Sequence, residues 1–447
     1  MLADNRAGSL AGVPGIRWRI LALIFLATTI NYIDRQSISL LFPVISRPGE
    51  LNLTPLQYSR ITSALLIAYM FSQSLSGKFF DRFGARVGFS VSIVVWSLAA
   101  MGHAFITGVA SFAALSFLLG FGEAGNWPGS AKVIAEWFPV RERALGMAVF
   151  NSGVAMGSVI APPLIIALQF KFGWRATFLL AGALGFPWLV AWLSVYRTPA
   201  THPRITVEEH ELILEGSDVS GSSAGGAVLS LTQLLRYRQV WAVVLARFFV
   251  DPIWWLFVLW LPEYLTKARG LSLKQIGLWA WVPYLAASTG SLFGGWLAGR
   301  LISGGMSVNR ARKTVIIIAA CMTPAGLLAA RAQSTFSALA FISLVLFSFQ
   351  MWVGNVQTLP SDFFPKELVG SVAGLGGTGA AIGSMIFTLT TGWIVTHFSY
   401  APVLTIAGLL APIGTTVLFC LAGRIQRISL DRASGSLRVA QITPAAT

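Results

Sequence analysis

Two adjacent charged residues, Asp34 and Arg35, stand inside the largely apolar stretch NYIDRQSISLLFP. On a helix, which rises about 1.5 Å per residue, Arg35 lies about 24 Å from Arg19 and about 18 Å from Arg47, so it cannot easily reach either end of the segment. A charge so deep in an apolar helix usually faces a partner or a water-filled cavity. Because adjacent helical residues do not face each other, Asp34 and Arg35 each need a partner of their own.

The chemistry that these residue types favour is the binding of an acid anion together with a proton. The guanidinium of arginine stays charged and can hold a carboxylate through two hydrogen bonds. A carboxyl group in poorly solvated surroundings prefers to be protonated. Glu123, in the stretch GFGEAGNWPGS, is similarly deep in another apolar run and can serve as the partner of Arg35.

The elements that must position these residues are apolar segments long enough to cross a bilayer, which takes roughly 17 to 25 residues. The chain is 55% hydrophobic and 11% charged, with a mean hydropathy of +0.71, whereas soluble domains carry about 25% charged residues. We therefore predict an all-α membrane protein with twelve transmembrane helices in two pseudo-symmetric six-helix bundles. The predicted spans are 18–46, 56–78, 86–106, 109–137, 143–169, 174–196, 239–266, 275–302, 313–332, 335–361, 367–396 and 400–424.

A polar stretch between the sixth and seventh spans separates the two bundles. It contains TVEEHELILEG, expected to form a short surface helix, and GSDVSGSSAGGA, a Gly/Ser-rich linker. Most of the 32 Lys and Arg residues fall on the side of the tails and of this linker, which predicts that both termini are cytoplasmic. The predicted parts are a tail at 1–17, a bundle at 18–197, a cytoplasmic linker at 198–238, a second bundle at 239–425 and a tail at 426–447.

The two halves also resemble each other in sequence. The segments 138–158 and 364–384 align without gaps, and a Gly-Asn dipeptide precedes each copy. The matched glycines are Gly153 with Gly379 and Gly157 with Gly383. Internal repeats are typical of transporters, whose substrate sites lie near the bilayer midplane between the repeats. This pattern favours a transporter over a membrane enzyme.

The joint after the second predicted span carries the stretch GKFFDRFGARVG. Glycine lets two helices approach closely, and the charged residues can pair or stabilise helix ends, so the cluster could lock one conformation. The residues of this predicted gate are Gly77, Asp81, Arg82 and Arg86. The matching joint of the second half, GGWLAGRLISGGMSVNRARK, has arginines but no aspartate. Simple anchoring on the cytoplasmic side is the alternative for both joints.

The order G-x-x-x-D-R-x-G-x-R between the second and third spans resembles the signature loop of the major facilitator superfamily. Within it, NYIDR, GEAGNWPGSAKVIAEWFPVRERALGMAVFNSG, DPIWWLFVLWLPEYLTKARGLSLKQIG and NVQTLPSDFFPKELVGSVAGLGGTGAAIG are similar to the anion:cation symporter family, above all to its bacterial hexuronate transporters. The resemblance covers about residues 18–424. It implies a monomer in a bacterial inner membrane that takes up sugar acids such as glucuronate and galacturonate with protons.

The resemblance also implies that the first and fourth spans line a central cavity, which makes Arg35 and Glu123 a predicted buried pair. A sugar-acid carboxylate could displace Glu123 from Arg35, and Glu123 would then take up a proton. Substrate and proton binding would be coupled by competition for the arginine. Asp34 is a second proton carrier implied by the family. A purely structural role is the alternative for both carboxyl groups.

Sugar hydroxyls need neutral hydrogen-bonding groups, and sugar rings need aromatic faces. The candidate substrate contacts are Tyr32, Tyr69, Asn126, Asn151, Asn355 and Gln357, with Trp254 and Trp255 as weaker ones. Helix packing is the alternative for each, because intramembrane amides also hold helices together. Arg247 and Asp251, four residues apart in the seventh span, are expected to pair with each other. Members of the family often carry an arginine where this chain has Ser116, so whether the site has a second anion-binding arginine stays open.

Other classes of function find little support in the sequence. The four histidines show no metal-ligand spacing, and the sequence has neither a phosphate-binding loop nor a catalytic triad. We therefore expect that the protein is not an enzyme and binds neither a metal nor a cofactor. The expected energy source is the proton gradient. The net charge of +15 is spread over many joints, which argues against nucleic acid. The alternatives are a transporter or exchanger of another acid, such as an aldonate, a dicarboxylate or a phosphate ester, and a membrane receptor that senses a sugar acid.

Overall fold

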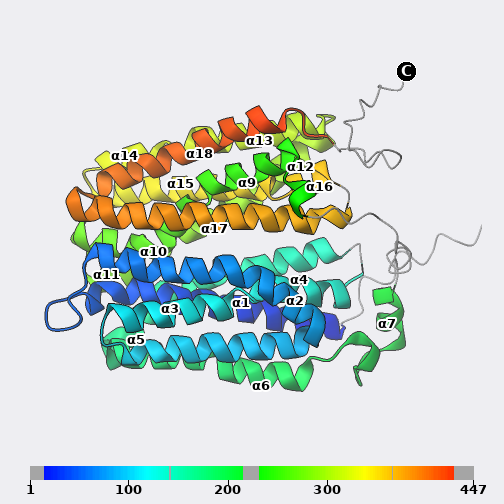
Figure 1. Cartoon of the computed structure of the whole chain (residues 1–447), viewed down its shortest axis with the longest axis horizontal. Coiled ribbons are helices and arrows are strands. Elements are labelled where there is room, and N and C mark those ends of the chain that lie inside the picture. The colour runs from blue at the N-terminus through cyan, green and yellow to red at the C-terminus, as the bar shows by residue number, and fades with distance from the viewer. Residues whose placement is uncertain (1–14, 140–141, 215–230, 365, 427–447) are drawn as a thin grey trace, which may run out of the picture. The chain divides into compact units, whose positions relative to one another are not determined.

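The computed structural model describes residues 15–139, 142–214, 231–364 and 366–426, and all regular secondary structure in these residues is helical (Figure 1). The chain divides by its contacts into two compact units. The first comprises 1–225 and 265–281, and the second comprises 226–264 and 282–447. The domain boundaries predicted from the sequence, at 197 and 238, stay predictions.

Each unit is built of helices, and the longer ones run side by side (Figure 1). Those of the first unit are α1 (Ile16–Ile45), α2 (Pro55–Gly102), α3 (Val109–Glu123), α4 (Asn126–Trp137), α5 (Arg143–Ala183), α6 (Gly185–Val195), α7 (Val207–Leu214) and α11 (Leu273–Trp279). Those of the second are α8 (Leu231–Leu234), α9 (Arg238–Val250), most of α10 (Pro252–Lys267), α12 (Val282–Ser303), α13 (Val308–Met322), α14 (Ala325–Arg331), α15 (Thr335–Val356), α16 (Leu359–Phe363), α17 (Lys366–His397) and α18 (Tyr400–Ala422).

Two glycines turn the chain where the sequence predicted separate spans. Helix α2 runs through both the second and the third predicted spans, and it is broken at Gly84, whose φ is 77°. Helix α5 is broken in the same way at Gly173, with a φ of 80°. Glycine adopts positive φ without steric cost, so each turn is made by one residue and no polar loop is needed. The fourth predicted span is split instead, between α3 and α4.

Eight helical segments of the described residues are long and apolar enough to cross a membrane. They cover 16–45, 75–105, 145–195, 238–267, 308–331, 335–363, 368–397 and 400–422. The predicted spans 56–78, 109–137 and 275–302 are not among them, but all three are helical. Since the segment 145–195 holds two of the predicted spans, 143–169 and 174–196, the structure agrees with a twelve-helix fold. The predicted surface helix is confirmed as α7, whereas the Gly/Ser-rich linker lies outside the described residues.

Glycines bring α5 of the first unit into backbone contact with α1. A Cβ atom added at Gly153 would lie 2.6 Å from the carbonyl oxygen of Phe25, and one added at Gly157 would lie 2.6 Å from that of Thr29. Only a residue without a side chain permits so close an approach. This crossing fixes the position of α1 along α5.

The second unit repeats this crossing with the matched glycines of α17. A Cβ atom at Gly379 would lie 2.6 Å from the carbonyl oxygen of Val244 in α9, and Gly383 meets the carbonyl of Phe248. The structure therefore confirms the predicted internal repeat and shows that α9 corresponds to α1. The contacted carbonyls, Phe25 with Val244 and Thr29 with Phe248, are 219 positions apart in both pairs.

Candidate functional site

The predicted pairing of Arg35 with Glu123 is confirmed, and it lies in the interior of the first unit. Arg35 Nε donates a hydrogen bond to Glu123 Oε2 over 2.9 Å, and its Nη2 lies 2.8 Å from the same oxygen. The side chains of Arg35 and Glu123 are 2% and 0% exposed. A buried ion pair is stable only when its remaining polar atoms also find partners, so the groups around it matter as much as the pair.

Two tyrosines and an asparagine complete the surroundings of the guanidinium. The ring centroids of Tyr32 and Tyr69 lie 4.6 and 4.9 Å from the central carbon of Arg35, within the range of cation–π attraction. Arg35 Nη2 also donates to the Tyr69 hydroxyl over 2.6 Å and to Asn31 Oδ1 over 3.0 Å. Both predicted aromatic wall residues thus contact the arginine itself.

Close helix packing places Glu123 opposite Arg35. A Cβ atom at Gly120 of α3 would lie 2.5 Å from the Leu65 carbonyl oxygen of α2, and one at Gly122 would lie 2.7 Å from the Trp96 amide nitrogen. The small residues of α3 therefore let it lie directly against α2. Helix α3 ends at Glu123, and Tyr69, which lies on α2, donates through its hydroxyl to the Glu123 carbonyl oxygen over 3.4 Å.

Several polar atoms beside this pair have no hydrogen-bond partner within the described part of the chain. Both carboxylate oxygens of Asp34 are of this kind, and so is Oε1 of Glu123. Asp34 is 1% exposed, so water does not compensate for the missing hydrogen bonds. Leaving a buried acceptor unsatisfied costs about 1–3 kcal/mol, and more for a charged group. A proton bound to one of these oxygens would remove the negative charge that makes the missing hydrogen bonds costly.

The other predicted contacts of the first unit are dispersed. Asn126 donates through Nδ2 to Thr28 Oγ1 of α1 over 3.0 Å, which joins α4 to α1. Asn151 of α5 is exposed and does not contact the ion pair through any hydrogen bond of the described residues. Ser116 is fully buried and lies 3.4 Å from His103 Nε2, so a histidine lies beside the position where an arginine was considered.

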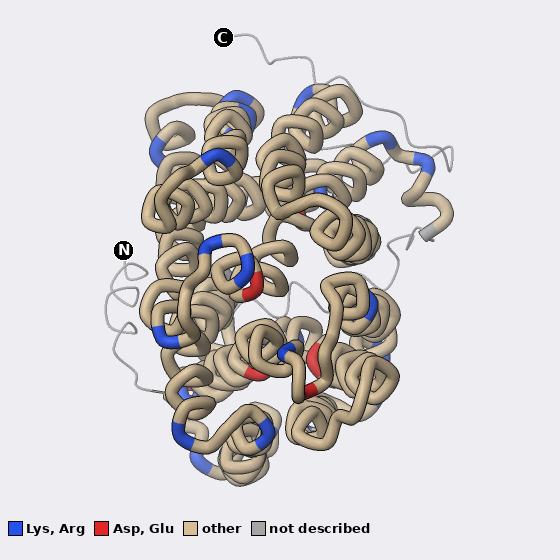
Figure 2. Tube along the Cα trace, turned by 90° about the vertical axis from the view of Figure 1, so that its left-hand side faces the viewer, with Lys and Arg blue, Asp and Glu red and all other residues tan. Residues whose placement is uncertain are grey.

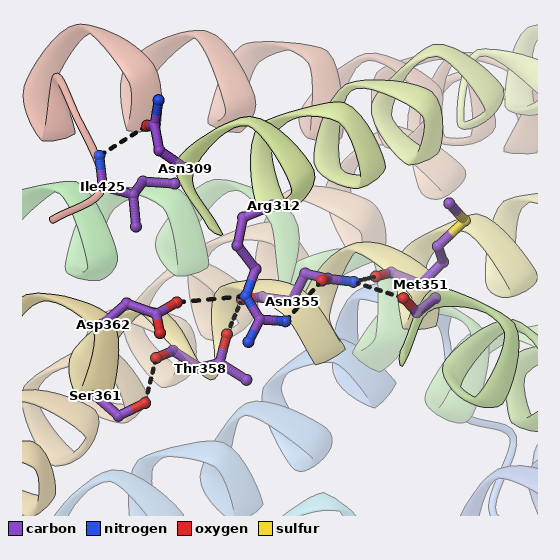
Figure 3. Close-up of polar contacts among 9 residues, drawn as sticks. Asn309, Arg312, Met351, Asn355, Thr358, Ser361, Asp362 and Ile425 are labelled. Atoms are coloured by element: carbon purple, nitrogen blue, oxygen red, sulfur yellow. Dashed lines mark hydrogen bonds and ion pairs between the residues drawn. The ribbon is translucent and has the colours of Figure 1, made fainter. Parts of the chain in front are cut away.

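In the second unit, Asn355 belongs to a separate polar cluster (Figure 3). Its Oδ1 accepts a hydrogen bond from Arg312 Nη1 over 3.1 Å, and its Nδ2 donates to the Met351 carbonyl over 3.0 Å. Arg312 Nε also lies 3.3 Å from Asp362 Oδ2. Asn355 thus joins α15 to α13 in this structure, whereas Gln357, at the end of α15, is exposed.

Two residues of the predicted gate, Gly77 and Asp81, line a surface cavity of about 520 Å³ between α2 and α4, together with Lys132. Asp81 Oδ1 accepts a hydrogen bond from Lys132 Nζ over 3.2 Å. A Cβ atom at Gly77 would meet nothing within 4 Å among the described residues. The predicted role of Gly77 in a close helix approach stays a prediction.

The two arginines of the predicted gate contact other groups than Asp81. Arg86 donates through Nη2 to the Leu193 carbonyl over 2.6 Å, and Arg82 lies over the ring of Phe83 at 5.5 Å. Nearby, the Tyr196 hydroxyl donates to Glu136 Oε2 over 2.6 Å.

Some of the contacting residues were not identified from the sequence. Asn31 precedes Arg35 by four residues, a helical spacing that could have revealed it. Lys132 and Asp362 are contributed by distant segments and carried no such signal. Among the described residues, no group of three His, Cys, Asp or Glu could hold a metal. Figure 2 marks Lys and Arg at many separate positions along the described chain.

Comparison with known proteins agrees with this architecture. The chain is 30% identical over 409 residues to a hexuronate transporter of Escherichia coli strain K12. The aligned region covers 91% of this chain and 94% of that protein. It is 32% identical over 285 residues to a galacturonate transporter of Dickeya chrysanthemi, covering 64% of this chain and 82% of that one. A probable galactarate/D-glucarate transporter of Escherichia coli strain K12 is 29% identical over 433 residues, covering 93% and 97% of the two chains.

Solved structures show the same fold at lower sequence identity. A D-xylose-proton symporter superposes with a TM-score of 0.70 at 18% identity, over 90% of this chain and 97% of the other. A bacterial homologue of the human lysosomal transporter Spinster superposes with a TM-score of 0.68 at 16% identity, over 92% and 96% of the two chains. Residues 24–388 match the family model of the Major Facilitator Superfamily. The chain therefore belongs to the major facilitator superfamily and is a multi-pass membrane transport protein, not an enzyme.

Proposed function

We propose that this protein is a proton-coupled symporter that brings hexuronates, such as glucuronate and galacturonate, or closely related sugar acids into the cell by alternating access. The observation that carries the proposal is the buried contact between Arg35 and Glu123, since it joins an anion-binding group to a proton acceptor. The similarity to hexuronate and galacturonate transporters supports the substrate class.

Competition for Arg35 would couple the two solutes. A substrate carboxylate that binds the guanidinium through two hydrogen bonds displaces the Glu123 carboxylate. Among the described residues Arg35 is the cation paired with Glu123. The displaced carboxylate is therefore stabilised by taking up a proton. Asp34, buried and without a hydrogen-bond partner in the described residues, is proposed as a second proton carrier.

Substrate recognition would then use the groups that surround the arginine. Tyr32 and Tyr69 supply aromatic faces next to the guanidinium, and Asn126 supplies an amide on α4. Asn151, Asn355 and Gln357 are proposed as further contacts. For Asn355 this requires that it exchange its present hydrogen bond from Arg312 for one with the substrate.

The proposal includes an orientation and a gate. Both termini would lie in the cytoplasm of a bacterium, with the protein in the inner membrane as a monomer. Gly77, Asp81, Arg82 and Arg86 would then belong to the cytoplasmic gate. The cavity beside Gly77 and the exposed ion pair between Asp81 and Lys132 suit contacts that form in one state and break in another.

The test is uptake of labelled glucuronate and galacturonate into proteoliposomes, with and without an inward proton gradient. The wild-type protein should accumulate substrate only with the gradient. Glu123→Gln should lose accumulation while it still exchanges labelled for unlabelled substrate, because the glutamine cannot carry a proton. Uptake that ignores both the gradient and the substitution would contradict the coupling and would favour an anion exchanger.

A sugar acid with two carboxylates is the second candidate substrate. The similarity to a probable galactarate/D-glucarate transporter over 93% of the chain favours it. Inhibition of labelled galacturonate uptake by galactarate, glucarate and galactonate separates the candidates, because the true substrate class inhibits at the lowest concentration.

A further inference from the structure

A second intramembrane ion pair lies in the other unit and has no part in the mechanism above. On α9, Arg247 donates to Asp251 Oδ2 through Nη2 over 2.6 Å and through Nε over 3.1 Å. The sequence predicted this pairing from the spacing of four residues, and the structure confirms it. The pair belongs to the apolar segment 238–267, which is long enough to cross a membrane.

The surroundings of Asp251 contain few other charges. The helices packed against α9 are α16, α17 and α18. Between Leu368 and Thr396, α17 has no titratable residue. At the two ends of α17 stand Lys366, Glu367 and His397, and the other titratable residues of these helices and of the adjoining α10 are Asp362, Tyr400, Cys420, Glu263, Tyr264 and Lys267. Arg247 is the cation paired with Asp251 among the described residues.

Asp251 resembles Glu123 in how its oxygens are used. Oδ2 takes both hydrogen bonds from the arginine, while Oδ1 is buried without a hydrogen-bond partner in the described residues. The side chain of Asp251 is 10% exposed and that of Arg247 is 17% exposed. In both pairs the arginine therefore binds one carboxylate oxygen and leaves the other open to a proton.

The internal repeat places this second pair on the corresponding face of its unit. With the separation of 219 positions between contacted carbonyls, Asp251 corresponds to Tyr32, whose ring covers Arg35, and Arg247 corresponds to Thr28. Trp254 corresponds to Arg35 and stacks on Phe349 at 6.0 Å. The helix of the second unit that corresponds to α1 thus carries both an arginine and a carboxylate, with Asp251 about one helical turn and Arg247 about two turns before the position that matches Arg35.

The neighbouring helix α17 presents a glycine to Arg247. A Cβ atom at Gly376 would lie 3.4 Å from Arg247 Cδ and 3.8 Å from Nη1. A larger side chain at this position would therefore press on the arginine.

We propose that Asp251 is an additional proton-binding site of the transport cycle, with Arg247 as the counter-ion that controls it. A proton from the aqueous phase bonds to a carboxylate oxygen of Asp251, the carboxyl group becomes neutral, and Arg247 keeps its charge. The pair changes from net zero to one positive charge, and the proton leaves by the reverse step on the other side of the membrane. This inference rests on the proposed proton coupling.

The number of protons carried per substrate tests this directly. In proteoliposomes with the membrane potential clamped at zero, the steady-state accumulation of substrate rises roughly tenfold per coupled proton for each unit of pH difference. Asp251→Asn should lower the steady-state accumulation about tenfold at a gradient of one pH unit. Arg247→Gln should have the same effect, because without its cation the buried carboxyl group stays protonated throughout the cycle.

Two controls separate this role from a structural one. Asp362→Asn breaks an Arg–Asp pair of the same unit and should change only the rate, not the accumulation at steady state. Asp251→Glu keeps a titratable group and should keep the wild-type number of protons carried per substrate. Normal accumulation by either Asp251→Asn or Arg247→Gln overturns the proposal, so a folding defect in one variant leaves the other as the test. If substrate accumulation by the wild-type protein does not depend on the proton gradient, the proposed symport is wrong instead.

Discussion

The carboxylate of Glu209 accepts hydrogen bonds from the backbone N–H groups of Ile16 and Arg17, both over 3.0 Å, although more than 190 residues separate these partners. Helix α7, which follows the last span of the first unit, thereby caps the start of α1 (Figure 1). The Arg17 guanidinium lies 3.7 Å from Glu209 and 3.4 Å from Glu142, which precedes α5. A negative charge at a helix N-terminus also interacts favourably with the helix dipole.

Replacement of Glu209 should therefore destabilise the first unit. Glu209→Ala removes a charged cap and leaves Arg17 buried without this carboxylate, and we expect a loss of about 1.5–3 kcal/mol. Thermal unfolding in detergent measures the effect. Glu208→Ala is the matched control, since Glu208 is exposed on the same helix. Equal stability of the two variants would show that the cap contributes nothing.

The Arg35 and Glu123 pair predicts opposite results for single and double replacements. Arg35→Met leaves a buried carboxylate without its cation and should cost about 3–5 kcal/mol. Adding Glu123→Met removes that charge and should restore stability to the wild-type level or above it, because well-packed apolar residues often replace a buried pair without loss. Transport should be absent from both. A double variant as unstable as the single one would show that the pair is not a coupled unit.

Tyr69 should matter through its hydroxyl as well as its ring. Tyr69→Phe keeps the ring against Arg35 but removes the acceptor at 2.6 Å from Nη2, and a hydrogen bond to a charged group contributes about 1.5–3 kcal/mol. We expect weaker substrate binding, seen as a higher KM for uptake. The wild-type protein is the comparison. A KM equal to that of the wild type would contradict this role of the hydroxyl.

The two equivalent helix crossings predict equivalent sensitivity to added volume. Gly157→Ala and Gly383→Ala would each force a methyl group against a backbone carbonyl, so each should destabilise its unit by about 1–3 kcal/mol. Gly295→Ala and Gly299→Ala are suitable controls, because a Cβ atom at either site of α12 meets nothing within 4 Å. Unfolding of each variant in detergent gives the comparison, and a larger loss in the controls would refute the assigned crossings.

Asp81 offers a test of the gate that does not depend on stability. Its side chain is 78% exposed, and exposed ion pairs contribute about 0–1 kcal/mol, so Asp81→Asn should unfold like the wild type. If the cluster selects a conformation, the same variant should transport several-fold more slowly. Unchanged transport would leave Asp81 with an anchoring role only.

The pairings inside the spans could be predicted because charges there have few alternatives. Arg35 and Arg247 each lie in an apolar segment with few carboxylates nearby in sequence. Asp251 followed from its spacing of four residues, whereas Glu123 followed from its similar depth together with the family resemblance, which brings the first and fourth spans together. The pairing of Lys132 with Asp81 could not be predicted in this way. At the joints many charged residues can pair at small cost, and the sequence does not rank them.

The limits of the fold prediction have a similar cause. The predicted spans already end on either side of Gly84 and Gly173, but hydropathy does not show that a single glycine with positive φ makes each turn between two helices. Glycine also does not reveal what faces it. Gly153 and Gly77 look alike in sequence, yet one meets a backbone carbonyl and the other borders a cavity. The internal repeat singled out Gly153, because its counterpart, Gly379, lies in the aligned segment of the second half.

The distance in sequence between Arg35 and Glu123 imposes an order on biosynthesis. The two residues are 88 positions apart, so a ribosome adding about 5–20 residues per second makes the arginine roughly 4–18 s before its partner. A lone arginine in hydrocarbon costs at least about 2.5–3.5 kcal/mol. During that interval α1 must stay beside water or the insertion machinery, and it can settle fully into lipid only after α3 has emerged and joined it.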